Sequence, residues 1–268
     1  MTRTQKAIKY FAIVLAFFLI FNIVIALISA FLFIGNFFGF INNDKYITET
    51  NEQISEKVNK INELHIDINY SKLEIKESQE FKVLTNNQKI KYTYKNNNIY
   101  IKESDKDFNF SSRKQSEIVI GLPKNTKFKL VKIDSGAGKI KLENISTENF
   151  DIEIGAGEVK INNLKVTNQT ELEGGAGSLT VSNANINDAD IDLGTGKFEF
   201  TGTMSGINKI DSGIGETNID LLDELENYTI KASKGLGKIN INGKEQNTYG
   251  TGKTKITIDG GIGSININ

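Results

Sequence analysis

The chain has 268 residues with 32 basic and 33 acidic side chains, a near-neutral balance that does not point to a polyelectrolyte partner such as nucleic acid. It contains no Cys, which excludes a disulfide framework, a thiolate nucleophile and a cysteine-ligated metal site. Its single His, His65, leaves no His-rich metal centre and argues against a His-assisted triad. The composition therefore removes several chemistries and identifies no catalytic, cofactor-binding or metal-binding residue.

An apolar segment dominates the N-terminal end. Tyr10–Ile34 is an uncharged run of 25 residues, which as a helix would span about 37 Å, more than the ~30 Å hydrocarbon core of a bilayer. Arg3, Lys6 and Lys9 precede the run, so the positive-inside rule keeps the N-terminus in the cytoplasm and sends the remainder outside. A cleaved signal peptide is the alternative, because residues 28–30 (Ile-Ser-Ala) imitate a cleavage site. The run exceeds the roughly 7–15 residues of a signal-peptide core, which favours an uncleaved anchor.

The rest of the chain divides by hydrophobic periodicity. Ile47, Ile54 and Val58 have helix-like spacings, which predicts a short juxtamembrane helix or stalk. From Leu64 onward the apolar period becomes two, as in short strands separated by Asn-rich turns. His65 lies at a polar phase of the first strand, where we expect a solvent-facing side chain. The predicted organisation is a cytoplasmic tail (1–9), a transmembrane helix (10–35), a juxtamembrane stalk (36–60), an N-terminal β-strand part of the ectodomain (61–133) and a Gly-x-Gly repeat part of the same ectodomain (134–268).

A Gly-x-Gly unit recurs seven times in the second half of the chain, at steps of 19, 20, 19, 19, 22 and 26 residues. The glycines are Gly136, Gly138, Gly155, Gly157, Gly175, Gly177, Gly194, Gly196, Gly213, Gly215, Gly235, Gly237, Gly261 and Gly263. Periods near 20 residues are typical of repeat architectures in which each unit is one coil. We interpret all of these residues as structural turn glycines.

The spacing of apolar residues around each unit predicts a corner at the glycines. Ile152 and Val159, for example, are seven residues apart, and a continuous strand would place them on opposite faces. Both can be buried only if the chain turns or bulges at Gly155 and Gly157, where Gly tolerates positive φ. We therefore predict an all-β, Gly-punctuated β-solenoid, which resembles a β-helix, with coils of about 19–20 residues, preceded by one N-terminal transmembrane helix. A β-sandwich of regular hairpins is the alternative fold.

Six of the seven units carry an acidic residue two positions before the first glycine. These residues are Asp134, Glu153, Glu173, Asp192, Asp211 and Asp259, and Ser233 is the exception. In a solenoid they would form a column with a spacing of about 4.8 Å. One hypothesis is a ladder of cation sites. The interpretation we prefer is that each carboxylate accepts backbone N–H groups of its own glycine turn, as in Asx-turns.

Three other motifs do not carry a site. Residues 250–254 imitate a phosphate loop, but Asn247 replaces the required upstream Gly and a strand follows, so no nucleotide site is predicted. The calcium β-roll pattern fails because Leu179 and Ile265 occupy the position that needs Asp. Sugar binding usually needs aromatic platforms, and only Tyr228 and Tyr249 are candidates within the repeats. Lysines at the third position after the first glycine alternate with glutamates, which indicates a solvated face of balanced charge.

The strand end at residues 118–123 and the run Asp134-Ser135-Gly136-Ala137-Gly138, with its later copies, resemble the bacterial putative-adhesin β-strand-repeat family, a group of unknown function. The resemblance covers roughly residues 61–268. It implies a membrane-anchored protein of the Gram-positive cell envelope, associated with envelope stress, and it supplies no catalytic residues, cofactor or metal.

The expected function is that of a single-pass, non-enzymatic surface protein whose solenoid acts as an adhesin-like or scaffolding module. The expected partners are the lipid bilayer, through Tyr10–Ile34, and another membrane protein or a cell-wall polymer. No nucleic-acid or nucleotide partner is expected. A glycan-modifying enzyme built on a β-helix is the alternative, and it would require exposed acidic residues gathered in a cleft.

Overall fold

The computed structural model describes residues 52–54, 58, 60–104 and 115–268. The predicted transmembrane helix, residues 10–35, and the tail before it lie outside the described residues. No helix within the described part of the chain is long and apolar enough to cross a membrane.

Strands make up nearly all of the described residues, which confirms the prediction of an all-β fold. The strands are β1 (Glu52–Ile54), β2 (Glu63–Ser78), β3 (Lys82–Thr85), β4 (Ile90–Lys95), β5 (Asn98–Glu103), β6 (Ser116–Pro123), β7 (Phe128–Asn187), β8 (Ala189–Ser205), β9 (Ile207–Leu221), β10 (Tyr228–Ile241), β11 (Lys244–Glu245), β12 (Thr248–Tyr249) and β13 (Thr254–Ile267). The one helical element among them is the short 3₁₀ helix η1 (Leu225–Asn227).

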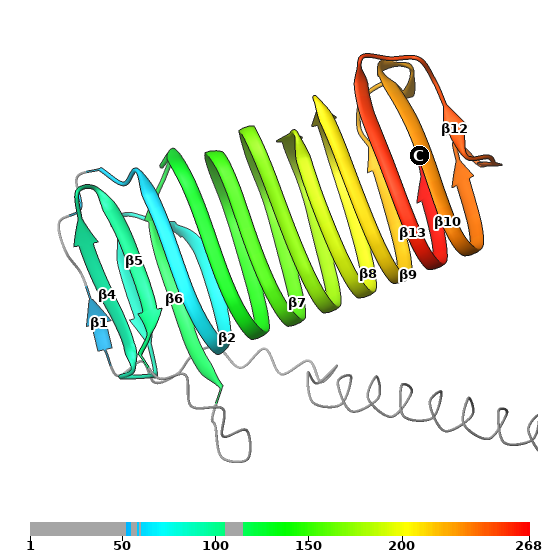
Figure 1. Cartoon of the computed structure of the whole chain (residues 1–268). Coiled ribbons are helices and arrows are strands. Elements are labelled where there is room, and N and C mark those ends of the chain that lie inside the picture. The colour runs from blue at the N-terminus through cyan, green and yellow to red at the C-terminus, as the bar shows by residue number, and fades with distance from the viewer. Residues whose placement is uncertain (1–51, 55–57, 59, 105–114) are drawn as a thin grey trace, which may run out of the picture. The chain divides into compact units, whose positions relative to one another are not determined.

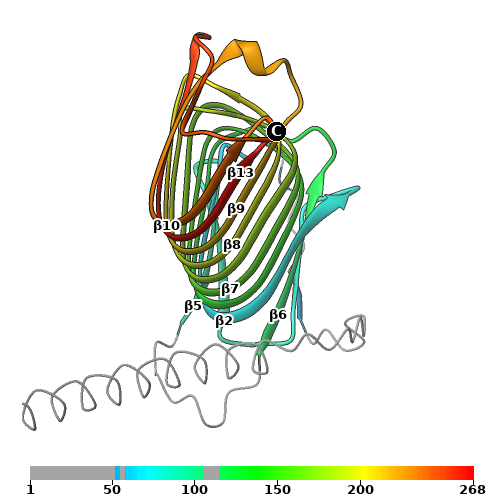
Figure 2. The same cartoon turned by 90° about the vertical axis from the view of Figure 1, so that its right-hand side faces the viewer.

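The long strands are wound into a parallel solenoid (Figure 1). β2 pairs in parallel with the start of β7. β7 has 60 residues and winds through three rungs, and β8 and β9 follow it as the next two rungs. Viewed along the solenoid, the rungs superimpose and bend at the same place (Figure 2). Parallel rungs in register, with one coil per repeat, distinguish this fold from a sandwich of antiparallel hairpins.

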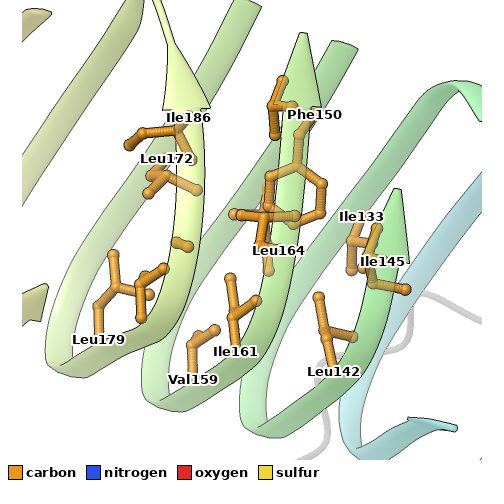
Figure 3. Close-up of a cluster of buried hydrophobic side chains, with 14 of the residues drawn as sticks. Ile133, Leu142, Ile145, Phe150, Val159, Ile161, Leu164, Leu172, Leu179 and Ile186 are labelled. Carbon is orange, nitrogen blue, oxygen red and sulfur yellow. The ribbon is translucent and has the colours of Figure 1, made fainter. Parts of the chain in front are cut away.

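The interior of the solenoid is filled by aliphatic side chains that stack from rung to rung (Figure 3). In one coil, Ile152 and Val159 are 2% and 1% exposed although seven residues separate them, so the inward face changes between them as expected. The inward face changes again between Ile161 and Leu164, which are three residues apart and both 1% exposed. Each coil therefore has a second corner.

In three successive coils of β7, asparagine supplies this second corner. Asn144, Asn163 and Asn183 have φ values of 58°, 60° and 53°. Asn tolerates this left-handed conformation better than other residues with a Cβ atom. The side-chain amide of Asn163 donates to Oδ1 of Asn144 at 2.5 Å, so neighbouring corners are also joined by a hydrogen bond. The sequence analysis did not predict this corner, although the odd spacing of apolar residues marks it as clearly as it marks the glycine corner.

The glycine corner is fixed by the close stacking of backbones. The second glycine of each unit has a φ between 122° and 147°. A Cβ atom on Gly157 would lie within 3.0 Å of the carbonyl oxygen of Gly138 on the preceding rung, and a Cβ atom on Gly177 would meet the carbonyl of Gly157 in the same way. Conformation and space therefore both require glycine here.

The first rung shows the same rule from the other side. In β2 the positions equivalent to the Gly-x-Gly unit are Asn69, Tyr70 and Ser71, of which Ser71 pairs with Gly138. β5 and β6 pair with β2 on both sides of the corner, but neither pairs with Asn69 or Tyr70. Ser71 pairs with Ser116 of β6, but its φ is not positive, so the conformation that requires glycine in the later rungs is absent from β2. β2 therefore adds one rung to the seven that carry Gly-x-Gly units, and it is the first in the stack. The predicted division at residue 134 falls inside β7, which begins at Phe128.

The rungs at the C-terminal end are not stacked in sequence order. β13 lies between β9 and β10 and pairs in parallel with both, so Gly263 stands between Gly215 and Gly237. β10 is the last rung, and the hairpin strands β11 and β12 pair antiparallel with its outer edge. The irregular steps of 22 and 26 residues in the sequence correspond to η1 and to this hairpin.

The N-terminal end also differs from the expected stalk. Glu52–Ile54, within the stretch predicted as a juxtamembrane helix or stalk, forms β1 and pairs antiparallel with β3. An edge strand presents unpaired backbone groups, and their pairing explains why this segment is extended. At the uncovered corner of β2, the backbone N–H of Asn69 donates to Oε2 of Glu103 at 2.8 Å, and Glu103 is 8% exposed.

We expect three adjacent glycines to respond differently to replacement by alanine. Gly177→Ala would add a Cβ within 3.0 Å of the Gly157 carbonyl at a φ of 138°, so it should lower the free energy of unfolding by more than about 2 kcal/mol. Gly175→Ala should also destabilise, because its Cβ would lie within 3.0 Å of the Gly155 carbonyl. Gly174→Ala meets only Cδ2 of Leu193, at 3.1 Å, and should leave stability unchanged or raise it by up to about 1 kcal/mol.

Urea unfolding of Ile47–Asn268, the compact unit that contains the solenoid, provides the measurement. Equal losses for Gly174→Ala and Gly177→Ala would contradict the carbonyl-stacking explanation.

Candidate interaction surface

The outward side chains of the sheet before the glycine corner form straight columns, because the rungs are in register. The nearest column to the corner contains, in spatial order, Lys91, Lys102, Asp67, Asp134, Glu153, Glu173, Asp192, Asp211, Asp259 and Ser233. We call its six carboxylates from Asp134 to Asp259 the acidic column. Beside it, Asp151, Glu171 and Asp190 add further carboxylates on the central rungs.

The acidic column is only partly neutralised. Lys132 forms ion pairs with Asp134, at 3.7 Å, and with Asp151, while Lys209 pairs with Asp211. Within the described ranges, Glu153, Glu173 and Asp192 form no ion pair. The centre of the column is therefore a region of uncompensated negative charge.

The preferred interpretation of these carboxylates was wrong. Across residues 60–104 and 115–268, none of the six accepts a hydrogen bond from the backbone of its own glycine turn; Asp259, for example, accepts one from the hydroxyl of Ser233. The reason is that the strand continues through the corner, so backbone N–H groups are paired with the adjacent rung. The same part of the chain contains no group of three or more acidic or His side chains placed to hold a metal ion.

Desolvation and neighbouring carboxylates raise the pKa of Glu173, the central residue of the acidic column. Partial desolvation, followed by the negative charges of Glu153, Asp151 and Asp192, raises the pKa of Glu173 above the ordinary Glu value. Glu158, on the other side of the corner, behaves in the opposite way. Partial desolvation raises its pKa, but the stronger combined effect of Lys160 and Lys139, whose Nζ atoms lie 2.5 and 3.3 Å from its carboxylate, lowers it.

The face beyond the glycine corner is balanced in charge. Lys139 pairs with Glu158, and Lys197 lies 2.6 Å from Glu199. On the last three rungs the charged residues give way to a ladder of asparagine amides, in which Asn240 donates to Asn266 and Asn266 donates to Asn218, at 3.0 and 2.8 Å.

His65 lies on the outer face of the first rung, as its polar phase predicts, but it is only partly exposed. Its ring stacks on Tyr100 of β5 with centroids 4.8 Å apart, and its Nε2 lies 2.9 Å from Oε2 of Glu63. Tyr228, considered as a sugar platform, is 0% exposed, and its hydroxyl donates to Asp223. Burial, followed by the hydrogen bond to Asp223, raises the pKa of Tyr228.

The middle residue of each Gly-x-Gly unit points outward at the corner and forms one more column. Along the rungs this column reads Tyr70, Ala137, Ala156, Ala176, Thr195, Ile214, Ile262 and Leu236. The last three, which we call the apolar ridge, are 49%, 51% and 68% exposed. Two smaller residues of the column, Ala176 and Thr195, adjoin a cavity of about 40 Å³. The cavity lies next to Gly174, which has no side chain to fill it.

The sequence analysis predicted the acidic column but missed the apolar ridge. The signal was present, because the residue between the two glycines changes from Ala to Thr and then to Ile, Leu and Ile along the chain. Its significance depends on knowing that this residue points outward and that the three aliphatic residues stand on adjacent rungs.

A parallel solenoid with glycine corners and ordered outer columns defines a repeat protein whose surface, rather than a cleft, is its main feature. Residues 53–263 match the model of the Toastrack DUF4097 family, so the chain belongs to this family. This confirms the resemblance to a β-repeat family of unknown function.

Two solved structures are similar to the chain. One is a putative cell adhesion protein from Clostridium sporogenes, with 19% identity, a TM-score of 0.40 and coverage of 81% of this chain and 97% of that chain. The other is a putative adhesin from Bacteroides fragilis, with 13% identity, a TM-score of 0.33 and coverage of 82% and 98%. No curated protein is significantly similar to the chain.

The opposite pKa shifts predict opposite responses to neutralising substitutions. A raised pKa means that charging Glu173 costs stability above that pKa, so Glu173→Gln should stabilise the protein at pH 7, by at most about 0.5 kcal/mol after solvent screening. A lowered pKa means that the Glu158 carboxylate contributes stability at neutral pH, so Glu158→Gln should destabilise slightly at pH 7.

The Glu173 effect should fade as the pH falls below the ordinary pKa of Glu, whereas the Glu158 effect should fade only as the pH falls through its lowered folded-state pKa, and both should shrink in high salt. Thermal unfolding of the two variants over a series of pH values from neutral to strongly acidic measures this. The same sign of change for both variants at pH 7 would contradict the assignment of charges to the two faces.

Proposed function

We propose that this chain is a single-pass, membrane-anchored, non-enzymatic protein of the bacterial cell envelope whose solenoid acts as an adhesin-like or scaffolding surface. The observation that carries the proposal is the register of the rungs, which repeats outward side chains at one spacing over eight rungs. Such a surface can bind an extended partner at many equivalent points. The exposed acidic residues form a column rather than a cleft, which favours a binding surface over a glycan-modifying enzyme.

The proposed location rests on the N-terminal sequence. Tyr10–Ile34 would cross the membrane, with Arg3, Lys6 and Lys9 in the cytoplasm and the solenoid outside. The first kind of partner is another membrane protein, through which a role in envelope stress would reach the cell interior. The second kind of partner is a polymer of the cell wall.

Topology is tested with protease added to intact, wall-stripped cells that express the full chain. The region after Asn42 should be digested, because the positively charged flank holds the N-terminus inside. A cytoplasmic marker protein should stay intact in the same cells. Protection of the solenoid would contradict the orientation, and recovery of a mature protein that begins near Phe31 would replace the anchor with a cleaved signal.

Binding without catalysis is tested with isolated cell envelopes. The full chain in nanodiscs should sediment with the envelopes and release no soluble glycan fragments over hours of incubation. Empty nanodiscs serve as the control. Release of fragments would support the alternative of a glycan-modifying enzyme. Failure of the chain to sediment with the envelopes would contradict the proposed binding function.

A further inference from the structure

The apolar ridge is exposed because of the constraint that shapes the corner. Ile214, Ile262 and Leu236 are each flanked by two glycines, so no side chain within the rung can cover them. The equivalent position on the four preceding rungs, from Ala137 to Thr195, holds Ala or Thr, which shows that the corner does not require a large aliphatic residue. Three adjacent large aliphatic side chains at an exposed position are typical of a contact surface.

The ridge has a regular geometry. Ile214 pairs with Ile262, and Ile262 pairs with Leu236, so the three side chains stand on consecutive rungs at a spacing of about 4.8 Å. An α-helix that presents one apolar residue per turn repeats every ~5.4 Å. A short helix laid along the solenoid axis can therefore place successive apolar residues against successive rungs, and the alanines of the earlier rungs extend its path.

The surrounding charges select the kind of helix. On the rungs of the ridge, the carboxylates of Asp211, Glu216 and Asp259 are balanced by lysines that include Lys209, which pairs with Asp211. In the acidic column, Asp192 and Glu173 form no ion pair within the described ranges, and they stand on the two rungs before that of Ile214. A helix that continues from the ridge along these rungs therefore meets negative charge, which disfavours an anionic membrane surface and complements a basic partner.

We propose that the apolar ridge and the acidic column together dock a basic amphipathic helix of a partner protein. The aliphatic side chains of this helix pack on Ile214, Ile262 and Leu236, and its Lys or Arg side chains face Asp192 and Glu173 on the adjoining rungs. This inference rests on the proposed function as a binding surface, and it names the site and the chemistry of the partner.

The probe is a synthetic helical peptide of 18 residues that carries Leu on one face and Lys on the other, a length of about 27 Å that follows five to six rungs. Its binding to the full chain in zwitterionic nanodiscs is measured by fluorescence anisotropy, with empty nanodiscs subtracted. A peptide with Glu in place of Lys tests charge, and a peptide with Ser in place of Leu tests apolar contact. We expect the Leu/Lys peptide to bind and the other two to bind at least about tenfold more weakly.

Variants of the chain locate the site. The triple variant Ile214→Ser, Ile262→Ser and Leu236→Ser should lose at least about tenfold in affinity, since it removes the apolar contact. The matched control is Ile207→Ser with Leu222→Ser, which removes aliphatic side chains of 67% and 62% exposure outside the ridge and should bind as the unmodified chain does. Asp192→Asn combined with Glu173→Gln should weaken binding in low salt and have little effect in high salt.

Several outcomes would overturn the proposal. Equal affinity of the ridge variant and its control would show that the ridge is not the site, and equal affinity for the Lys and Glu peptides would remove the role of the acidic column. Sedimentation that reveals a dimer lost only in the ridge variant would assign the ridge to a second copy of the chain. Ridge-dependent binding to anionic vesicles would assign it to lipid. A chain that adheres to envelopes equally well with and without the ridge would retain the surface function but lose this inference.

Discussion

The close stacking of peptide groups at one corner determines most of this structure. The carbonyl oxygen of one rung occupies the space that a Cβ atom of the next rung would need, as between Gly138 and Gly157. Every rung from β7 to β10 therefore carries glycine there, and in the first rung Ser71, whose φ is not positive, takes the place of the second glycine. The same bare backbone leaves the residue between the glycines exposed, so the corner that closes the core also presents a column of outward side chains. Fold and surface have one cause.

Much of this was predictable because it follows from local rules. The odd separation of Ile152 and Val159 located the glycine corner, and the constant offset of the carboxylates from the glycines located the acidic column. The role of those carboxylates was not predictable, since it depends on whether backbone N–H groups at the corner are already paired with a neighbouring rung. Only the three-dimensional stacking answers that question.

The order of the rungs could not be predicted for a different reason. Each rung offers its neighbours the same backbone surface, with a glycine at the same register, so the glycine rule is satisfied whichever rung follows β9. Long-range order is decided at the ends, by elements with weak sequence signals. β11 and β12 pair with four residues of β10, and β1 consists of three residues. These short pieces limit the exposed edges that would otherwise allow open-ended pairing between molecules.

The position of β13 has a consequence for how the molecule is completed. The chain emerges from its N-terminal end, and the rungs of β7, β8 and β9 can stack as they appear, each on a finished neighbour. β10 follows β9 along the chain, but its native neighbour is β13, which comes later in the chain. The rungs up to β9 can therefore stack in sequence order, whereas β10 reaches its native position only when β13 is present between it and β9. A repeat protein is usually regarded as a structure that can grow from any point, but here the three aliphatic residues of the apolar ridge stand side by side only after β13 has been inserted.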